Sequence, residues 1–235
     1  MKRTIIVTAD GSTTIHIPEW NEQYHSKHGA IQEAYHVFIK YGLKHFNDLK
    51  LNQQTAPSSS TAILEIGFGT GLNAFITLLE AQKNKQSIDY VGIEAYPVSS
   101  EEIKKLNYAK ELHTENSEFL FKKIHEAAWE ENHKISPVFS LTKRKQFFSE
   151  INDTEAYNII YFDAFGARVQ PELWTETIFK RMYNALKPNG ILVTYSAKGS
   201  VRRALQSVGF TVEKLPGPPG KREMLRATKY SSHSS

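Results

Sequence analysis

Apolar residues near the start of the chain follow two different spacings. Two β-rich runs within residues 4–17 flank Asp10-Gly11, a dipeptide suited to the tight turns that join antiparallel strands. Further along, apolar side chains recur three and four positions apart, at Ile31, Ala34, Tyr35, Phe38, Ile39 and Leu43. The pattern predicts a β-hairpin, a helix over about 30–46 and a polar linker over 52–60.

From Thr61 onward, short apolar runs alternate with amphipathic segments. The predicted strands cover 61–67, 87–97, 136–142, 157–165 and 191–197. The predicted helices cover 72–82, 99–109, 116–132, 171–190 and 199–209. A Ser99…Glu102 capping box begins the second of these helices, and Pro188-Asn189-Gly190 is the expected stop of the fourth. The alternation predicts an α/β fold with a parallel sheet covered on both faces and two closing strands within 210–229.

The size and composition of the chain favour one main domain. Its 235 residues are 40% hydrophobic and 23% charged, which is enough to bury a sizeable core. We expect an N-terminal hairpin and helix extension over 1–57, the main domain over 58–230 and a disordered tail over 231–235. No apolar run approaches the ~20 residues of a membrane span, and the N-terminus lacks the apolar region of a signal peptide. These features predict a soluble, cytoplasmic protein.

Cysteine is absent, and this excludes several classes of chemistry. Disulfides, thiolate zinc sites, iron–sulfur clusters and a cysteine nucleophile are all ruled out. The nine histidines show no metal-binding spacing, so we expect no metal. The net charge of +4 is compatible with a polyanionic partner and equally with an ordinary enzyme.

A glycine-rich turn, "EIGFGTGLN", joins the strand from 61 to the helix from 72. Gly67, Gly69 and Gly71 let the backbone approach a ligand where a Cβ would clash, and the helix directs its N–H groups at that ligand. Glu94 follows the next strand, where a carboxylate can accept hydrogen bonds from ribose hydroxyls. Together these features predict a site for a nucleoside-containing ligand.

The glycine spacing distinguishes among such ligands. Leu72 stands where the dinucleotide fingerprint G-x-G-x-x-G has its third glycine, and no Walker motif is present. Glu65, just before the glycines, would repel a pyrophosphate and favours a ligand with positive charge. S-adenosylmethionine meets both conditions, and we also expect Asn73 and Ala95 to bind it.

Asp163 follows a strongly apolar run at the predicted carboxyl end of a central strand, the edge where ligands lie in open α/β sheets. A carboxylate there could orient and deprotonate an attacking amine, or it could simply cap a loop. Phe165 could stack on a planar base or pack as part of the wall. Without a cysteine, methylation of a pyrimidine carbon through a thiolate is excluded, which leaves amine or oxygen acceptors.

Five ordered motifs in this chain resemble the methyltransferase domain of the MnmC family, the tRNA 5-methylaminomethyl-2-thiouridine methyltransferases. They are "LEIGFGTGLN", "GIEAYP", "YFDAFGARVQPELWTETIF", "LVTYSAKGSVRRALQSVGF" and "GPPGKREML". The resemblance implies a class I methyltransferase fold, Rossmann-like, with seven strands of which the last is antiparallel. It also implies methyl transfer from S-adenosylmethionine to the exocyclic amine of 5-aminomethyl(-2-thio)uridine at tRNA wobble position 34, with Asp163 as the catalytic aspartate. The flavin oxidase domain of bifunctional members is not expected in this chain.

The resemblance also directs attention to adenine and to the RNA. The family often has an acidic residue that reads the adenine amino group, where this chain has the basic "SLTKRKQFF"; backbone groups or Gln146 are left for that role. Arg202, Arg203, Lys221 and Arg222, with Lys198 and Arg226 nearby, could bind phosphates of the anticodon stem-loop, or they could be solvated surface charges. A small-molecule amine methyltransferase and a different nucleotide-binding module stay open as alternatives, as does the oligomeric state.

Overall fold

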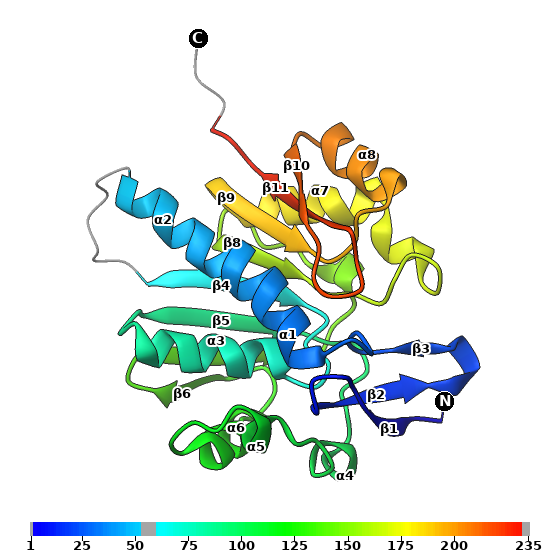
Figure 1. The fold of residues 1–235 in the computed structure, drawn as a ribbon. Coiled ribbons are helices and arrows are strands. Elements are labelled where there is room, and N and C mark those ends of the chain that lie inside the picture. The colour runs from blue at the N-terminus through cyan, green and yellow to red at the C-terminus, as the bar shows by residue number, and fades with distance from the viewer. Residues whose placement is uncertain (1, 53–59, 232–235) are drawn as a thin grey trace.

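An eight-stranded mixed sheet forms the centre of the molecule (Figure 1). The structure is a computed structural model that describes residues 2–52 and 60–231. The strands of the sheet lie in the order β10-β11-β9-β8-β4-β5-β7-β6. They are β4 (Thr61–Ile66), β5 (Ile88–Ile93), β6 (Asn132–Ser136), β7 (Phe139–Arg144), β8 (Tyr157–Phe162), β9 (Leu186–Thr194), β10 (Thr211–Pro216) and β11 (Glu223–Thr228). β4 is central and pairs in parallel with β5 and β8, as the apolar runs predicted.

The two ends of this sheet depart from the parallel pattern. β11 lies antiparallel between β9 and β10, so the predicted antiparallel last strand is confirmed. At the other end β6 pairs antiparallel with β7 and adds an eighth strand to the seven expected. The start of β6 was predicted as the end of a helix. This edge strand has the sequence Asn-His-Lys-Ile-Ser, which lacks the alternation of apolar residues that would predict a strand.

One long helical segment crosses the face of the sheet that also carries α3 (Leu72–Lys83) and α6 (Ser117–Glu126), while α7 (Glu176–Ala185) and α8 (Gly199–Ser207) cover the other face (Figure 1). The segment comprises α1 (Ala30–Ala34), the π-helical η2 (Tyr35–Lys44) and α2 (His45–Asn52), and so extends beyond the predicted end near 46. A Cβ on Gly42 would lie 3.1 Å from the Tyr161 ring and 3.2 Å from Val193, so this glycine allows close packing of helix on sheet.

Three further predicted helices are wrong in extent. The segment 116–132 is helical only over α6, Ser117–Glu126. The segment 99–109 forms two short helices, α4 (Ser100–Ile103) with the predicted capping box and α5 (Tyr108–Glu111). The segment 171–190 begins with the 3-10 turn η4 (Pro171–Trp174), and α7 ends at Ala185, before the predicted Pro-Asn-Gly stop. The predicted Pro-Asn-Gly stop lies within β9 instead. The pairing register between β8 and β9 shifts at this point, so the turn residues are accommodated as an irregularity in the strand.

The N-terminal hairpin is present and carries one more strand than predicted. β1 (Thr4–Val7), β2 (Thr13–Ile17) and β3 (Glu22–Gln23) form a separate small sheet, with the 3-10 turn η1 (Pro18–Trp20) at its tip. This sheet lies beside the carboxyl ends of the central strands (Figure 1). The predicted boundary near 57 and all but the first residue of the tail predicted over 231–235 fall outside the described residues. Within the described ranges, no helix combines the length and apolar character needed to cross a membrane.

Candidate active site

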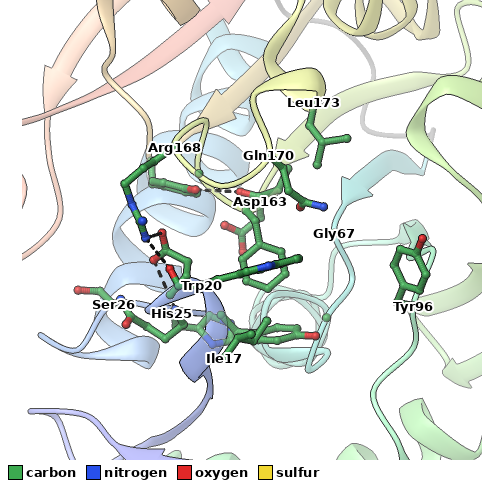
Figure 2. A pocket seen from close by; sticks show the side chains of 18 of the residues that line it. Ile17, Trp20, His25, Ser26, Gly67, Tyr96, Asp163, Arg168, Gln170 and Leu173 are labelled. Atoms are coloured by element: carbon green, nitrogen blue, oxygen red, sulfur yellow. Dashed lines mark hydrogen bonds and ion pairs between the residues drawn. The ribbon is translucent and has the colours of Figure 1, made fainter. Parts of the chain in front are cut away.

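A pocket of about 1580 Å³ opens at the carboxyl ends of the central strands. The N-terminal sheet forms one side of it, and Figure 2 shows Trp20 and Arg168 on that side with Tyr96 on the other. The volume exceeds the roughly 300–1,000 Å³ typical of a site for one small ligand. The pocket therefore has room for a cofactor together with part of a second substrate.

The glycine loop lies against the strand end that carries Asp163. Gly67 has a φ of +89°, and a Cβ there would come within 2.8 Å of the Asp163 carbonyl oxygen. Gly69, at φ +51°, would place a Cβ 3.0 Å from the Tyr24 ring. The Asp163 N–H donates to the Ile66 carbonyl at 2.9 Å and ties the two strand ends together. Only glycine fits this narrow space, as the spacing of the motif predicted.

Glu94 lines the pocket at the end of β5, and backbone groups hold both of its oxygens. It accepts hydrogen bonds from the Gly69 N–H at 3.1 Å and from the Tyr96 N–H at 2.9 Å. Each carboxylate oxygen has further lone pairs, which are available to hydroxyl donors in the pocket. Ala95 lines the same wall. Backbone hydrogen bonds thus hold the loop and the Glu94 carboxylate together at the pocket.

Asn73, the second residue of α3, joins two carboxyl groups. Its Nδ2 donates to Glu65 Oε1 at 2.9 Å and to Asp163 Oδ2 at 2.8 Å. Tyr90 donates to the other Glu65 oxygen at 2.9 Å. Glu65 and Asn73 are buried and do not line the pocket. The expectation that Glu65 faces a cationic ligand directly is therefore wrong in its geometry: Glu65 lies beneath the pocket and supports the amide that orients Asp163.

The two carboxyl groups have unusual proton affinities. Burial, followed by the nearby charge of Glu33, raises the pKa of Asp163 to about 7, and the Asn73 hydrogen bond and Lys221 oppose the rise. Burial also raises the pKa of Glu65 well above its ordinary value, although the hydrogen bonds from Asn73 and Tyr90 oppose the rise. Asp163 is then the member of the pair that can exchange a proton with the pocket in the physiological range.

Aromatic side chains from the N-terminal sheet meet the loop that follows Asp163. Phe165 packs edge-to-face with Trp20 at 5.5 Å and with Tyr24 at 4.9 Å between ring centroids. Arg168 Nη2 donates to the carbonyls of Trp20 and Asn21, at 3.0 and 3.2 Å, and forms an ion pair with Glu22 at 3.2 Å. Trp20 and Tyr24 were not predicted as site residues. Their only signal was an aromatic-rich loop near the N-terminus, far in sequence from Asp163.

Two basic residues at the end of β7, Lys143 and Arg144, do not line the pocket. Lys143 is buried and donates to the His125 carbonyl at 2.9 Å, and burial lowers its pKa to about 8. Arg144 pairs with Asp153 at 3.0 Å. Gln146 does not line the pocket, so the suggestion that it reads adenine is not supported by its position. The pocket wall beside Ala95 is instead formed by Tyr96, Ser99, Phe147, Phe148 and Ser149.

Comparison with known protein families supplies the decisive observation. The model of a family described as S-adenosyl-L-methionine-dependent methyltransferase matches residues 104–230, more than half of the chain. The chain belongs to this methyltransferase family. Its cofactor is S-adenosylmethionine, as the glycine spacing and Glu94 predicted.

Known relatives of this methyltransferase carry a more specific name. The chain is 31% identical over 229 residues to the tRNA 5-methylaminomethyl-2-thiouridine biosynthesis bifunctional protein MnmC of Leptospira borgpetersenii, a match that covers 92% of this chain and 33% of that protein. It is 28% identical over 215 residues to the protein of the same name from Hydrogenovibrio crunogenus, covering 87% and 31%. The chain spans about a third of the length of these curated relatives. The predicted resemblance to the MnmC methyltransferase domain is confirmed.

Solved structures agree on the fold of the methyltransferase. The crystal structure of MnmC2 from Aquifex aeolicus gives a TM-score of 0.75 at 23% identity, covering 98% of this chain and 71% of that one. Spermidine synthase from Thermotoga maritima gives 0.55 at 13% identity, covering 97% and 68%. At these identities the likeness concerns the fold alone, and it confirms the class I methyltransferase architecture.

The residues of this methyltransferase fit its cofactor. The cradle beside Gly67 and Gly69 has no room for a Cβ, and Glu94 presents an acceptor one loop away. No cluster of three or more His, Cys, Asp or Glu side chains that could hold a metal ion is found in the described ranges. The residues that would hold the cofactor are therefore the glycine loop, Glu94 and Ala95, with Asn73 and Glu65 acting from behind.

The predicted phosphate-binding residues of the methyltransferase do not form one cluster. Arg202 is half-buried and Arg203 exposed on α8, and neither lines the pocket. Lys221 lines the pocket, but its ammonium group pairs with Glu33. Arg226 is buried and pairs with Glu213 at 3.0 Å, so its proposed contact with RNA is wrong. Other cations are exposed without an ion pair to any described residue; these are Arg222 next to Lys221, and Lys27 and Lys198 at the pocket itself.

Proposed function

We propose that this protein transfers a methyl group from S-adenosylmethionine to the exocyclic amine of 5-aminomethyl(-2-thio)uridine at tRNA wobble position 34. The observation that carries the proposal is the placement of Asp163 in the wall of a large pocket, next to the glycine loop and with its pKa raised to about 7. The names of the curated relatives supply the substrate class.

Asp163 is the proposed orienting base. S-adenosylmethionine supplies an electrophilic methyl group when bound. An alkylamine is mostly protonated near neutral pH and then has no lone pair, so Asp163 must accept a proton from the substrate nitrogen before that nitrogen can react. A carboxylate whose pKa lies near the working pH suits this task, because it is ionised often enough to act and basic enough to hold the proton.

Asn73 and the glycine loop set the position of that base. The Asn73 amide donates to one Asp163 oxygen and leaves the other to face the substrate. The backbone bond from Asp163 to Ile66 fixes the carboxylate relative to the donor loop. This geometry favours a nitrogen held between the carboxylate and the cofactor side of the pocket, where orientation alone lowers the barrier.

The aromatic wall would receive the uracil ring. Trp20 and Phe165 both line the pocket and present flat apolar faces, which bind an unstacked base. The modified base would have to leave the anticodon stack to reach Asp163. Lys27 and Lys198, exposed at the same pocket, are suited to the phosphates on either side of it.

The test is methyl transfer from labelled cofactor to tRNA that carries 5-aminomethyluridine. We expect transfer to this tRNA and none to the same tRNA without the aminomethyl group. Asp163→Asn, which keeps the size and one acceptor of the side chain, should abolish most transfer while cofactor binding persists. Equal turnover of the variant and the wild type would contradict the role of Asp163.

A small amine is the second candidate substrate, because three carboxylate residues line the cavity without an ion pair to any described residue. They are Glu94, Asp163 and Glu172. Salt separates the two candidates. Transfer to tRNA should fall steeply as salt screens the phosphate contacts, whereas transfer to a small amine should change little between 50 and 200 mM salt, a range over which proteins with several phosphate contacts lose about 10³-fold or more in affinity.

A further inference from the structure

An ion pair lies beside Asp163 that the proposed reaction does not use. Glu33, from α1, is only 6% exposed, and its carboxylate accepts from the Ser26 N–H at 2.8 Å and from the Lys221 ammonium. Lys221 comes from the loop between β10 and β11, almost 190 residues further along the chain. Both residues line the pocket that contains Asp163.

Tyr195 connects this ion pair to the strand end of Asp163. The Lys221 ammonium lies 3.9 Å from the centre of the Tyr195 ring, a cation–π contact. The Tyr195 hydroxyl donates to the carbonyl of Ala164 at 2.8 Å. Figure 2 shows this hydrogen bond close to Asp163. The pair is thus fixed in place by three elements and is not a mobile surface contact.

The two members of the pair act on Asp163 in opposite directions. The negative charge of Glu33 disfavours ionisation of a neighbouring carboxyl group, and the positive charge of Lys221 favours it. Both charges belong to residues that line the pocket of Asp163, and Glu33 has the larger influence of the two. Lys221 therefore offsets part of the effect of Glu33.

We propose that Glu33 and Lys221 are positioning residues that hold the charge state of Asp163 by opposing each other. The proposal rests on the role of Asp163 given above. It assigns to the β10–β11 loop a function in the chemistry of the site, in place of the phosphate contact predicted for Lys221.

The remaining groups around Asp163 carry no comparable charge near neutral pH. From α3 it meets the neutral amide of Asn73, and Glu65 on β4 lies behind that amide with a raised pKa. Tyr90 on β5 and Tyr195 after β9 both have pKa values raised by burial and are uncharged. Among the described residues, Glu33 and Lys221 are the side chains whose charges act on Asp163.

The test compares Glu33→Gln, Lys221→Met and the double variant by carbon-13 NMR titration of Asp163 in full-length protein labelled at the aspartate carboxyl. Asp163→Asn identifies the signal. Relative to wild type, we expect the pKa of Asp163 to fall by about one pH unit in Glu33→Gln and to rise by about one in Lys221→Met. The double variant should lie between the two single variants, because both opposing charges are then gone.

This pattern separates the proposal from a merely structural role. Loss of packing would shift the pKa of Asp163 in the same direction in both single variants, and further still in the double variant. That result would overturn the proposal, and so would the absence of any pKa shift. Thermal unfolding and calorimetric binding of S-adenosylmethionine verify that each variant is folded. Lys221→Arg should keep the wild-type pKa, and it serves as the conservative control should Lys221→Met unfold.

Activity provides a separate readout. If the proposed function holds, the acidic limb of kcat/KM should move to lower pH in Glu33→Gln and to higher pH in Lys221→Met. If the pKa of Asp163 shifts in opposite directions but no methyl group is transferred to tRNA, the role of Glu33 and Lys221 stands and the proposed substrate is wrong. If methyl transfer to tRNA depends on Asp163 but the pKa shifts are not opposed, the proposed substrate stands and the role of Glu33 and Lys221 is wrong.

Discussion

The donor side and the acceptor side of the pocket are built in different ways. The donor side is short in sequence: the glycine loop and Glu94 lie within 28 residues, and backbone N–H groups hold them together. The acceptor side brings together Trp20 from the N-terminal sheet, Glu33 from α1, Asp163 after β8 and Lys221 from the last loop. On the acceptor side, contacts between side chains hold the site together, whereas on the donor side backbone hydrogen bonds do so.

This difference indicates which half can vary. A donor site made of backbone depends on glycine and on local geometry, so it changes little when side chains change. An acceptor site made of side chains from separate elements can be altered at one position while the fold is kept. The loop "FDAFGARVQP" illustrates this, because Arg168 there pairs with Glu22 in the N-terminal sheet.

The largest expected effect comes from the residue that joins the two sides. Asp163→Asn should lower kcat by about 10²–10⁴-fold, the usual contribution of a general base, because the amide cannot take the substrate proton. Single-turnover transfer from labelled cofactor measures it. Affinity for S-adenosylmethionine, followed by calorimetry, should change less than threefold. A large loss of affinity would instead place Asp163 on the donor side.

The next effect tests the backbone character of the donor side. Gly67→Ala places a Cβ 2.8 Å from the Asp163 carbonyl at a φ of +89°. Strain of about 1–3 kcal/mol should weaken cofactor binding by roughly 10–100-fold and displace Asp163 as well. Gly199→Ala is the matched control, because a Cβ there meets only the movable end of Arg203, at 3.2 Å. Equal affinities of the two variants would show that the loop is not a tight cradle.

A smaller loss is expected at the single donor-side carboxylate. Glu94→Gln removes a charged acceptor, and hydrogen bonds to charged groups contribute about 1.5–3 kcal/mol, so the Kd for S-adenosylmethionine should rise at least tenfold. Glu172→Gln changes a carboxylate on the acceptor side of the same pocket and should leave this Kd unaltered. If both variants bind the cofactor equally well, the division of the pocket into two sides is incorrect.

Arg168 allows a finer test on the acceptor side. Arg168→Ala removes the hydrogen bonds to Trp20 and Asn21 and should raise KM for tRNA a few-fold with little change in cofactor affinity. Arg168→Lys keeps the positive charge but lacks the branched guanidinium donor. Its KM for tRNA should lie between those of the wild type and Arg168→Ala. If Arg168→Lys matches the wild type, charge toward RNA and not the attachment of the N-terminal sheet is what matters.

The smallest expected effect is on stability. Because the pKa of Asp163 is raised from 3.8 to about 7 in the folded protein, ionising it opposes folding. Its stabilising contribution is complete below about pH 4 and is lost as the pH rises through 7. Asp163→Asn should therefore unfold at a higher temperature than wild type at pH 8, with a smaller difference at pH 5. A constant difference across this range, measured by calorimetry, would contradict the raised pKa.

Sequence patterns predicted the donor side well because its contacts are local. The spacing of Gly67, Gly69 and Gly71 and the distance to Glu94 depend on one strand–turn–helix–strand unit. Asp163 was also identified, since the carboxyl ends of parallel strands meet at one edge. Asn73 was expected at the cofactor, yet its amide points to two carboxyl groups, an orientation that the spacing of residues does not determine.

The acceptor side could not be predicted in the same way. Trp20 and Tyr24 reach Phe165 only because the N-terminal sheet lies at the end of the central strands, which no local pattern specifies. Lys221 was predicted to contact phosphate because its partner, Glu33, is distant in sequence. Partner choice between distant charges depends on tertiary packing, and one sequence alone contains no record of it.

The order of strands has a consequence for how the chain folds as it is made. β11 is the last strand in sequence but lies inside the sheet, between β9 and β10. Until residues 223–228 leave the ribosome, β9 has an unpaired edge that can recruit another nascent chain. Lys221 emerges only just before them. The sheet can therefore close, and Glu33 can gain its counter-charge, only after residues 221–228 have been made, so a polypeptide cut short before residue 221 would lack both.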